Sequence, residues 1–171
     1  MKISIVIFLS IILLFSSVCA KYATEYIDVY GIDIIEYGLY AGHTMNKTTN
    51  ESLPTGGRNI LSKISLIKET DSIPAKIGNM FGFRYKIKGG LIGSEAKITK
   101  VLIYPPPGLV NPVTHKTFFK SSFSLKKKLG KTSYTGYTFE KEWELVPGEW
   151  TIQLLYGNRK LTEKKFNITK E

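Results

Sequence analysis

The chain has 171 residues, 43% of them hydrophobic, and this length and composition suit one domain with an apolar core. Its formal net charge is +10, from 24 Lys and Arg against 14 Asp and Glu, which attracts polyanions and equally favours solubility. The single cysteine, Cys19, lies near the N-terminus, so residues 21–171 have no thiol for a disulfide, a nucleophile or a metal site.

A secretory signal peptide is predicted for residues 1–20. The apolar run Ile3–Phe15 follows a charged residue, and small residues lead up to Ala20, which is the usual order in such a leader. We expect cleavage between Ala20 and Lys21. Residues 21–171 then form a single exported domain, periplasmic or fully secreted, with no transmembrane segment.

Two alternatives to cleavage remain open for this leader. An uncleaved membrane anchor needs about 20 apolar residues to cross the bilayer core, and the run Ile3–Phe15 is shorter. Lipidation of Cys19 is the other alternative, although Val18 occupies a position where bacterial lipoproteins favour a small residue. We therefore favour simple cleavage.

The rest of the chain has the pattern of a β protein. No stretch shows the i, i+3, i+4, i+7 spacing of an amphipathic helix, and short segments rich in β-branched and aromatic residues alternate with Gly, Pro and Asn. The predicted strands are residues 32–40, 60–68, 78–87, 96–104, 117–125, 137–146, 150–156 and 160–168. The polar stretch Gly42–Arg58 is predicted to be a mobile loop.

Turn residues mark where these strands end. Three prolines at 105–107 lack the backbone donors that a strand interior needs, and Asn111-Pro112 is a second turn signal. Gly157-Asn158 suits a two-residue hairpin turn. Seven or eight strands of this kind predict an all-β fold, an immunoglobulin-like antiparallel sandwich, with a small closed barrel as the alternative. The face that carries Trp150, Ile152, Leu154 and Tyr156 is predicted to be the centre of the core.

No catalytic or cofactor motif stands out. His43 and His115 fall in predicted loops without neighbours at metal-ligand spacing, so neither a metal nor a cofactor is expected. Glu140, Glu142 and Glu144 alternate along the predicted strand 137–146, which would place them on one face. This pattern is typical of a solvated strand facing basic neighbours, and a hydrolase that uses paired carboxylates is the alternative.

Two groups of basic residues are candidate anion sites. The first comprises Lys126, Lys127, Lys128 and Lys131, and the second comprises Arg159, Lys160, Lys164 and Lys165. Outside the cytoplasm these groups would meet lipopolysaccharide or another anionic polymer. No specific nucleic-acid binding is expected, because no recognised nucleic-acid module is present and the chain carries an export signal.

Several motifs, spread over nearly the whole predicted mature chain, resemble a bacterial family of exported domains of unknown function, DUF3859. The motifs are Ile35–Tyr40, Ile73–Gly78, Phe81–Tyr85, Gly108–Pro112 and the long run Tyr134–Tyr156. The resemblance implies an exported bacterial β-domain without an established activity, and it supplies no catalytic residues. Glu36, Arg84, Asn111 and Trp143 are the polar or aromatic members of the matching motifs. His115 stands where the family pattern has glycine, which puts a tight turn there in doubt.

These observations favour a monomeric, non-enzymatic binding or accessory module of the cell envelope, whose partner is an envelope protein or an anionic polymer. The predicted loops Pro105–Lys116 and Gly42–Arg58 are its candidate contact surfaces. The predicted binding residues are Glu36, Arg84, Asn111, Lys126, Lys127 and Lys128. Binding of polyanions such as lipopolysaccharide through the lysines is the first alternative, and an unrecognised hydrolase is the second.

Overall fold

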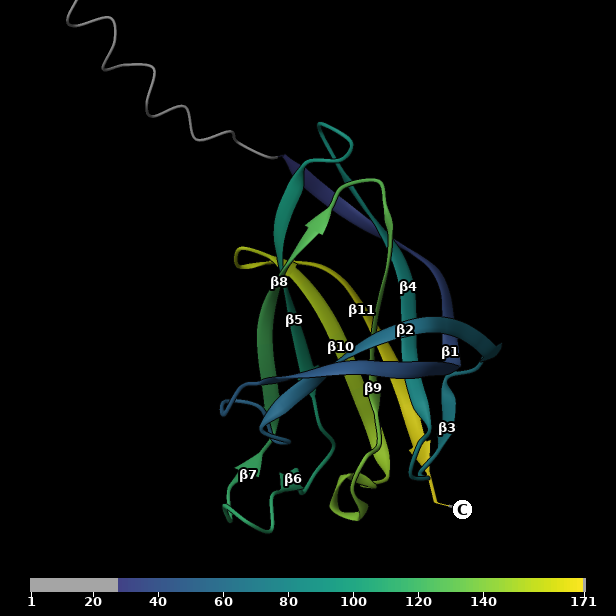
Figure 1. The fold of residues 1–171 in the computed structure, drawn as a ribbon, viewed down its shortest axis with the longest axis vertical. Coiled ribbons are helices and arrows are strands. Elements are labelled where there is room, and N and C mark those ends of the chain that lie inside the picture. Colours follow the sequence, from purple (N-terminus) through teal and green to yellow (C-terminus); the bar gives the residue numbers. More distant parts are fainter. Residues whose placement is uncertain (1–27, 171) are drawn as a thin grey trace, which may run out of the picture.

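The computed structural model describes residues 28–170, so the predicted signal peptide lies outside the described residues. Two mainly antiparallel sheets pack face to face (Figure 1). The first has the order β2 (Gly57–Lys68), β1 (Val29–Thr49), β4 (Met80–Gly89) and β9 (Thr132–Thr138). The second has the order β3 (Ser72–Pro74), β11 (Arg159–Thr169), β10 (Gly148–Tyr156), β5 (Glu95–Ile103) and β8 (Lys120–Lys128). β6 (Leu109–Val110) pairs with β7 (Thr117–Phe118), and a 3-10 turn covers Glu142–Glu144.

This arrangement confirms the predicted immunoglobulin-like sandwich. The strands divide between separate sheets with free edges, so the alternative of a closed barrel is wrong. All pairs in the two main sheets are antiparallel except β3 with β11. Among residues 28–170 there is no helix long and apolar enough to span a bilayer.

The core follows from alternation along the central strands. Trp150, Ile152 and Leu154 of β10 are fully buried, as the sequence predicted, in one core cluster with the aromatic side chains of β4. Tyr156, the fourth member of the predicted face, is only partly buried against that cluster. The Trp150 ring meets the Phe81 ring edge-on, with 5.8 Å between their centroids. Such edge-to-face pairs contribute about 0.5–1.5 kcal/mol beyond the burial of their area, which helps to hold the two sheets together.

The prediction of a mobile loop over Gly42–Arg58 is wrong for most of its length. β1 continues to Thr49 and β2 begins at Gly57, so only residues 50–56 form a turn. We call residues 41–65 the arm, because β4 pairs with β1 only as far as Tyr40 and the rest forms a two-stranded ribbon. Threonine favours an extended backbone, and in a ribbon each strand satisfies the backbone hydrogen bonds of the other. Two paired strands in solvent therefore need few apolar residues.

The arm bends across the molecule rather than extending away from it. Register shifts interrupt its pairing between Ala41 and His43 and between Thr44 and Asn46, and such bulges bend and twist a ribbon. In Figure 1 its two strands run across the front of the sheets. Leu53 in the turn is buried, so the arm packs against the body of the sandwich.

The predicted strand 137–146 is also wrong beyond its start. β9 ends at Thr138, and the chain then leaves the sheet and forms the 3-10 turn. The Glu144 carboxylate accepts hydrogen bonds from the Glu140 backbone N–H at 3.1 Å and from the Tyr137 hydroxyl at 3.0 Å. Because the Glu144 side chain, rather than a neighbouring strand, accepts the hydrogen bond of this backbone N–H, the chain forms a turn here and no longer pairs with the sheet. The three glutamates therefore do not line one face of a strand.

Candidate functional site

A cavity of about 540 Å³ lies between the two sheets, beneath the arm. Volumes of about 300–1,000 Å³ are usual for sites that hold small molecules. Its apolar walls come from both sheets and from the arm, and comprise Leu53, Leu61, Ile64, Leu102, Phe123 and Leu125. A buried hydrogen bond of 2.6 Å between the Tyr104 and Ser121 hydroxyls also lies at the cavity.

Four basic side chains and one carboxylate line this cavity, and one of the four, Lys47, forms an ion pair with that carboxylate, Glu140. Each of the other three basic side chains comes from a different strand. Lys100 is on β5, Lys127 on β8 and Arg58 on β2 in the arm. Lys100 points inward because it is in phase with the buried residues Ile98 and Leu102, and only 8% of it is exposed. Lys127 is partly buried, whereas its neighbours along the strand are exposed.

The cationic groups gather around the ring of Phe123. The guanidinium carbon of Arg58 lies 5.3 Å from the ring centroid and the Lys100 ammonium lies 5.6 Å from it. The Lys100 ammonium also donates a hydrogen bond to the Gly136 carbonyl. A ring face attracts cations only weakly compared with a carboxylate, so these contacts leave the positive charge uncompensated.

The electrostatics of the cavity therefore favour an anion. Within residues 28–170, none of Lys100, Lys127 and Arg58 forms an ion pair with a carboxylate. Burial, together with the nearby charge of Arg58, lowers the pKa of Lys100 to about 8. Burial and the same arginine also lower the pKa of Lys127. An anion in this cavity would relieve the repulsion among the three cations.

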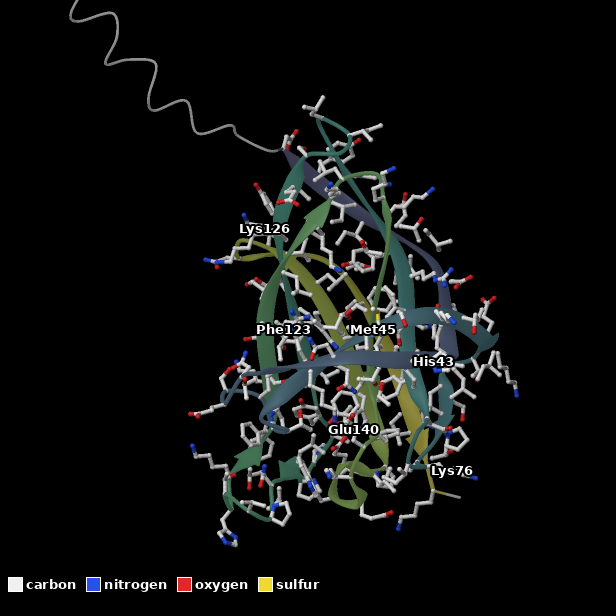
Figure 2. All side chains as sticks on the ribbon, viewed as in Figure 1. His43, Met45, Lys76, Phe123, Lys126 and Glu140 are labelled. Atoms are coloured by element: carbon white, nitrogen blue, oxygen red, sulfur yellow. The ribbon has the colours of Figure 1, made fainter. Side chains whose placement is uncertain are left out.

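Glu140 holds the arm over the cavity. Its carboxylate accepts a hydrogen bond from the Asn59 amide at 2.7 Å and forms an ion pair of 2.9 Å with Lys47. Lys47 is on one strand of the arm and Asn59 on the other. Burial alone would raise the pKa of Glu140, but these hydrogen bonds outweigh it and lower the pKa. In Figure 2, Phe123 and Glu140 lie on the two sides of the arm where it crosses the sheets.

Comparisons with known proteins place this architecture in a family. The family described as a domain of unknown function, DUF3859, matches residues 29–168. The chain belongs to this family.

A solved structure supports the fold of this DUF3859 domain. An immunoglobulin-like protein, PA1606, from Pseudomonas aeruginosa is 28% identical, with a TM-score of 0.55 over 86% of this chain and 99% of that chain. An alkylpurine DNA glycosylase from Pseudomonas fluorescens also matches, at 11% identity and a TM-score of 0.38 over 57% of this chain and 27% of that chain. A likeness that weak carries no argument. The comparison with curated proteins gives no match.

Glu36 and Arg84, two of the predicted binding residues, lie together outside the cavity of the DUF3859 domain. The Arg84 Nε atom is 3.4 Å from a carboxylate oxygen of Glu36, and the guanidinium also donates to the Ile64 carbonyl. The Tyr40 hydroxyl donates to the Glu36 backbone carbonyl at 3.2 Å. These contacts tie β1, β2 and β4 together, and a binding role for the pair stays a prediction.

Asn111 joins the predicted contact loop Pro105–Lys116 to the arm. Its amide nitrogen donates to the Pro54 carbonyl at 2.8 Å, and its amide oxygen accepts from the backbone N–H groups of Val113 and Thr114. His115 has a positive φ of 55°, a conformation that glycine adopts at lower cost. The His115 N–H also donates to the Asn111 carbonyl at 2.8 Å, so the tight turn that the sequence put in doubt is present.

The predicted lysine group divides between two surroundings. Lys126 and Lys128 are exposed, and Figure 2 shows Lys126 at the outer side of the molecule, while Lys127 lines the cavity. Trp143 packs at the edge of the core, partly buried. In the described part of the chain, no three His, Cys, Asp or Glu side chains gather as metal ligands would.

Sequence reasoning missed Arg58 and Lys100. Lys100 had a signal: it occupies an inward position of an alternating strand between Ile98 and Leu102, and a lysine there needs an explanation. Arg58 had none, because it was assigned to the end of a polar loop. Glu144 is fully buried, burial raises its pKa, and one of its carboxylate oxygens has no hydrogen-bond partner among the described residues.

Proposed function

We propose that this protein is an exported, non-enzymatic binding module of the bacterial cell envelope that holds an organic anion in the cavity between its sheets. The observation that carries the proposal is the convergence of Arg58, Lys100 and Lys127 on one cavity, where none of them forms an ion pair within residues 28–170 and the lining carboxylate, Glu140, is already paired with Lys47. Burying a lysine without a counter-charge is costly, and a bound anion would offset that cost.

The walls of the cavity indicate the rest of the ligand. Phe123, Leu102 and Ile64 offer apolar contacts, whereas the cations are close to the Phe123 ring. A ligand with one carboxylate or phosphate group attached to an aromatic or aliphatic body would satisfy both. A long polymer would not fit beneath an arm that Glu140 fastens.

The remaining parts of the proposal rest on the sequence and the placement of acids. The leader pattern of residues 1–20 supports export. Glu140 is engaged with the arm, and Glu144 with Tyr137 and the backbone of residue 140. Because both carboxylates already have structural partners, binding is a better interpretation of the site than acid-base catalysis.

Calorimetric titration with 1-naphthoate, with 1-naphthyl phosphate and with neutral 1-naphthalenemethanol tests this proposal. We expect at least one of the anions to bind and the neutral alcohol not to bind. Lys127→Met should weaken binding of the anion by about tenfold, which corresponds to about 1.4 kcal/mol. Lys126→Met is the matched control, since it removes the same charge from the adjacent, exposed position of β8.

Three results would contradict the proposal: no binding of either anion, equal binding of the alcohol, or equal loss in the two lysine variants. Thermal unfolding of both variants establishes that they remain folded. The test thus distinguishes binding by the Lys127 ammonium group in the cavity from attraction by the overall positive charge of the protein.

A further inference from the structure

The turn between β4 and β5 presents two large apolar side chains to solvent. Leu91 is 69% exposed and Ile92 is 77% exposed. The backbone holds this turn firmly, because Ser94 N–H donates to the Leu91 carbonyl at 3.2 Å and Gly93 N–H donates to the Leu129 carbonyl at 3.1 Å. The apolar pair is therefore displayed by a braced turn and does not fold back onto the core.

Exposed lysines surround this end of the molecule. They come from β4, β5, β8 and the turn after β8, and comprise Lys86, Lys88, Lys97, Lys126, Lys128 and Lys131. The strand register places Lys128 opposite Glu95 and Lys126 opposite Lys97. The acidic residues on the same strand ends and at the start of β1 are Asp28, Asp33 and Glu95, and Asp33 is already paired with Lys88 at 2.8 Å. This end is therefore positively charged.

The described part of the chain begins at the same end, with Asp28. The Asp28 carbonyl accepts a hydrogen bond of 2.9 Å from Gly90 N–H, and Figure 1 shows the start of β1 beside the β4–β5 turn at the top. The sequence before Asp28 contains the apolar run Ile3–Phe15. During export this end is thus the part of the domain that follows a membrane-inserting segment.

From these three observations we infer that this end of the sandwich docks on a bilayer surface that contains anionic phospholipids. Leu91 and Ile92 enter the boundary between headgroups and acyl chains, and the surrounding lysines contact lipid phosphates. A few apolar residues combined with a basic surface give reversible binding that depends on lipid charge. The inference does not depend on the cavity, which lies between the sheets beneath the arm.

Vesicle co-sedimentation of the chain from Lys21 onward tests this inference, since all described strands lie within residues 29–169. We expect binding to phosphatidylcholine vesicles that contain phosphatidylglycerol and none to phosphatidylcholine alone. Raising NaCl from about 0.05 M to about 0.5 M should release the protein, because salt screens exposed charges. The double variant L91S/I92S should bind roughly tenfold more weakly.

Val113→Ser is the control for apolar exposure, because Val113 is 84% exposed in the loop at the opposite end, and this variant should bind like the unmodified protein. Lys100→Met, in the cavity, should also leave vesicle binding unchanged. The inference is overturned if the unmodified protein does not sediment with anionic vesicles or if V113S loses as much binding as L91S/I92S. It is equally overturned if size-exclusion chromatography shows that Leu91 and Ile92 instead join two copies of the chain.

Discussion

Burial of the Lys100 ammonium group costs folding free energy, and a bound anion would offset that cost. It is almost fully buried, its ammonium group donates to the Gly136 carbonyl, and Arg58 nearby adds like charge. A buried cation without a carboxylate destabilises the folded state, and replacement by an apolar residue of similar size is often stabilising. Lys100 therefore serves binding at the expense of stability.

We expect Lys100→Met to raise the free energy of unfolding by about 1–2 kcal/mol at pH 7 and to weaken binding of 1-naphthoate or 1-naphthyl phosphate. The pH dependence gives a second readout. The pKa of Lys100 is about 8 in the folded protein and about 10.4 in an unfolded chain. Between these values the unfolded state binds more protons, so the contribution of Lys100 to stability rises with pH.

Urea denaturation at several pH values between 7 and 10 measures this effect. Below pH 8 both states are protonated and the penalty is constant, whereas above pH 8 it declines. Lys126→Met is the control, since it should neither stabilise the protein nor change the slope. A Lys100→Met protein that is less stable at pH 7, or that keeps the full rise with pH, would show that Lys100 carries no such penalty.

At the scale of elements, the arm is the feature that converts an open edge of the sandwich into a cavity. Its two strands extend beyond β4, bend at register shifts and return over the space between the sheets. Contacts fix it at four places: Glu140 with Asn59 and Lys47, Arg58 with Phe123, Asn111 with Pro54, and Arg84 with the Ile64 carbonyl. The arm therefore lies over the cavity with few side-chain contacts to the rest of the molecule, and a single substitution can remove each of them.

We expect Glu140→Ala to loosen the arm without unfolding the sandwich. Backbone hydrogen exchange in residues 44–61 should accelerate by about fivefold, because the hydrogen bonds and ion pair lost contribute about 1 kcal/mol. The anionic probe should also dissociate faster. Since the folded-state pKa of Glu140 is lowered, this fastening is complete at neutral pH and is lost as the pH falls through that lowered pKa.

Glu149→Ala supplies the control for this prediction. Glu149 forms a surface ion pair of 2.9 Å with Lys165, away from the arm, so its removal should leave exchange in residues 44–61 unchanged. Equal exchange in the arm of the Glu140→Ala variant and of the unmodified protein would mean that Glu140 does not fasten the arm.

At the scale of the whole molecule, the proposed roles in anion binding and bilayer docking depend on the compartment in which the protein resides. We expect the protein expressed in a bacterial host to be cleaved between Ala20 and Lys21 and to appear in the periplasmic fraction or the medium. Intact-mass spectrometry measures the cleavage site. Cys19→Ser should change nothing, because Cys19 lies in the removed leader. A retained leader, or a lipid mass on Cys19, would contradict the prediction. The domain would then be tethered to a membrane rather than released from it.

Local pattern alone determined much of this protein. A two-residue period in β10 and the turn residues at 105–107 and 157–158 predicted buried faces and strand ends, because burial and turn chemistry act over a few residues. Local pattern failed where polar residues form a ribbon, in the arm, and where the Glu144 side chain satisfies the backbone of residue 140, after β9. Only the tertiary structure brought Arg58, Lys100 and Lys127 to one cavity, because their strands belong to two sheets whose stacking no single segment encodes.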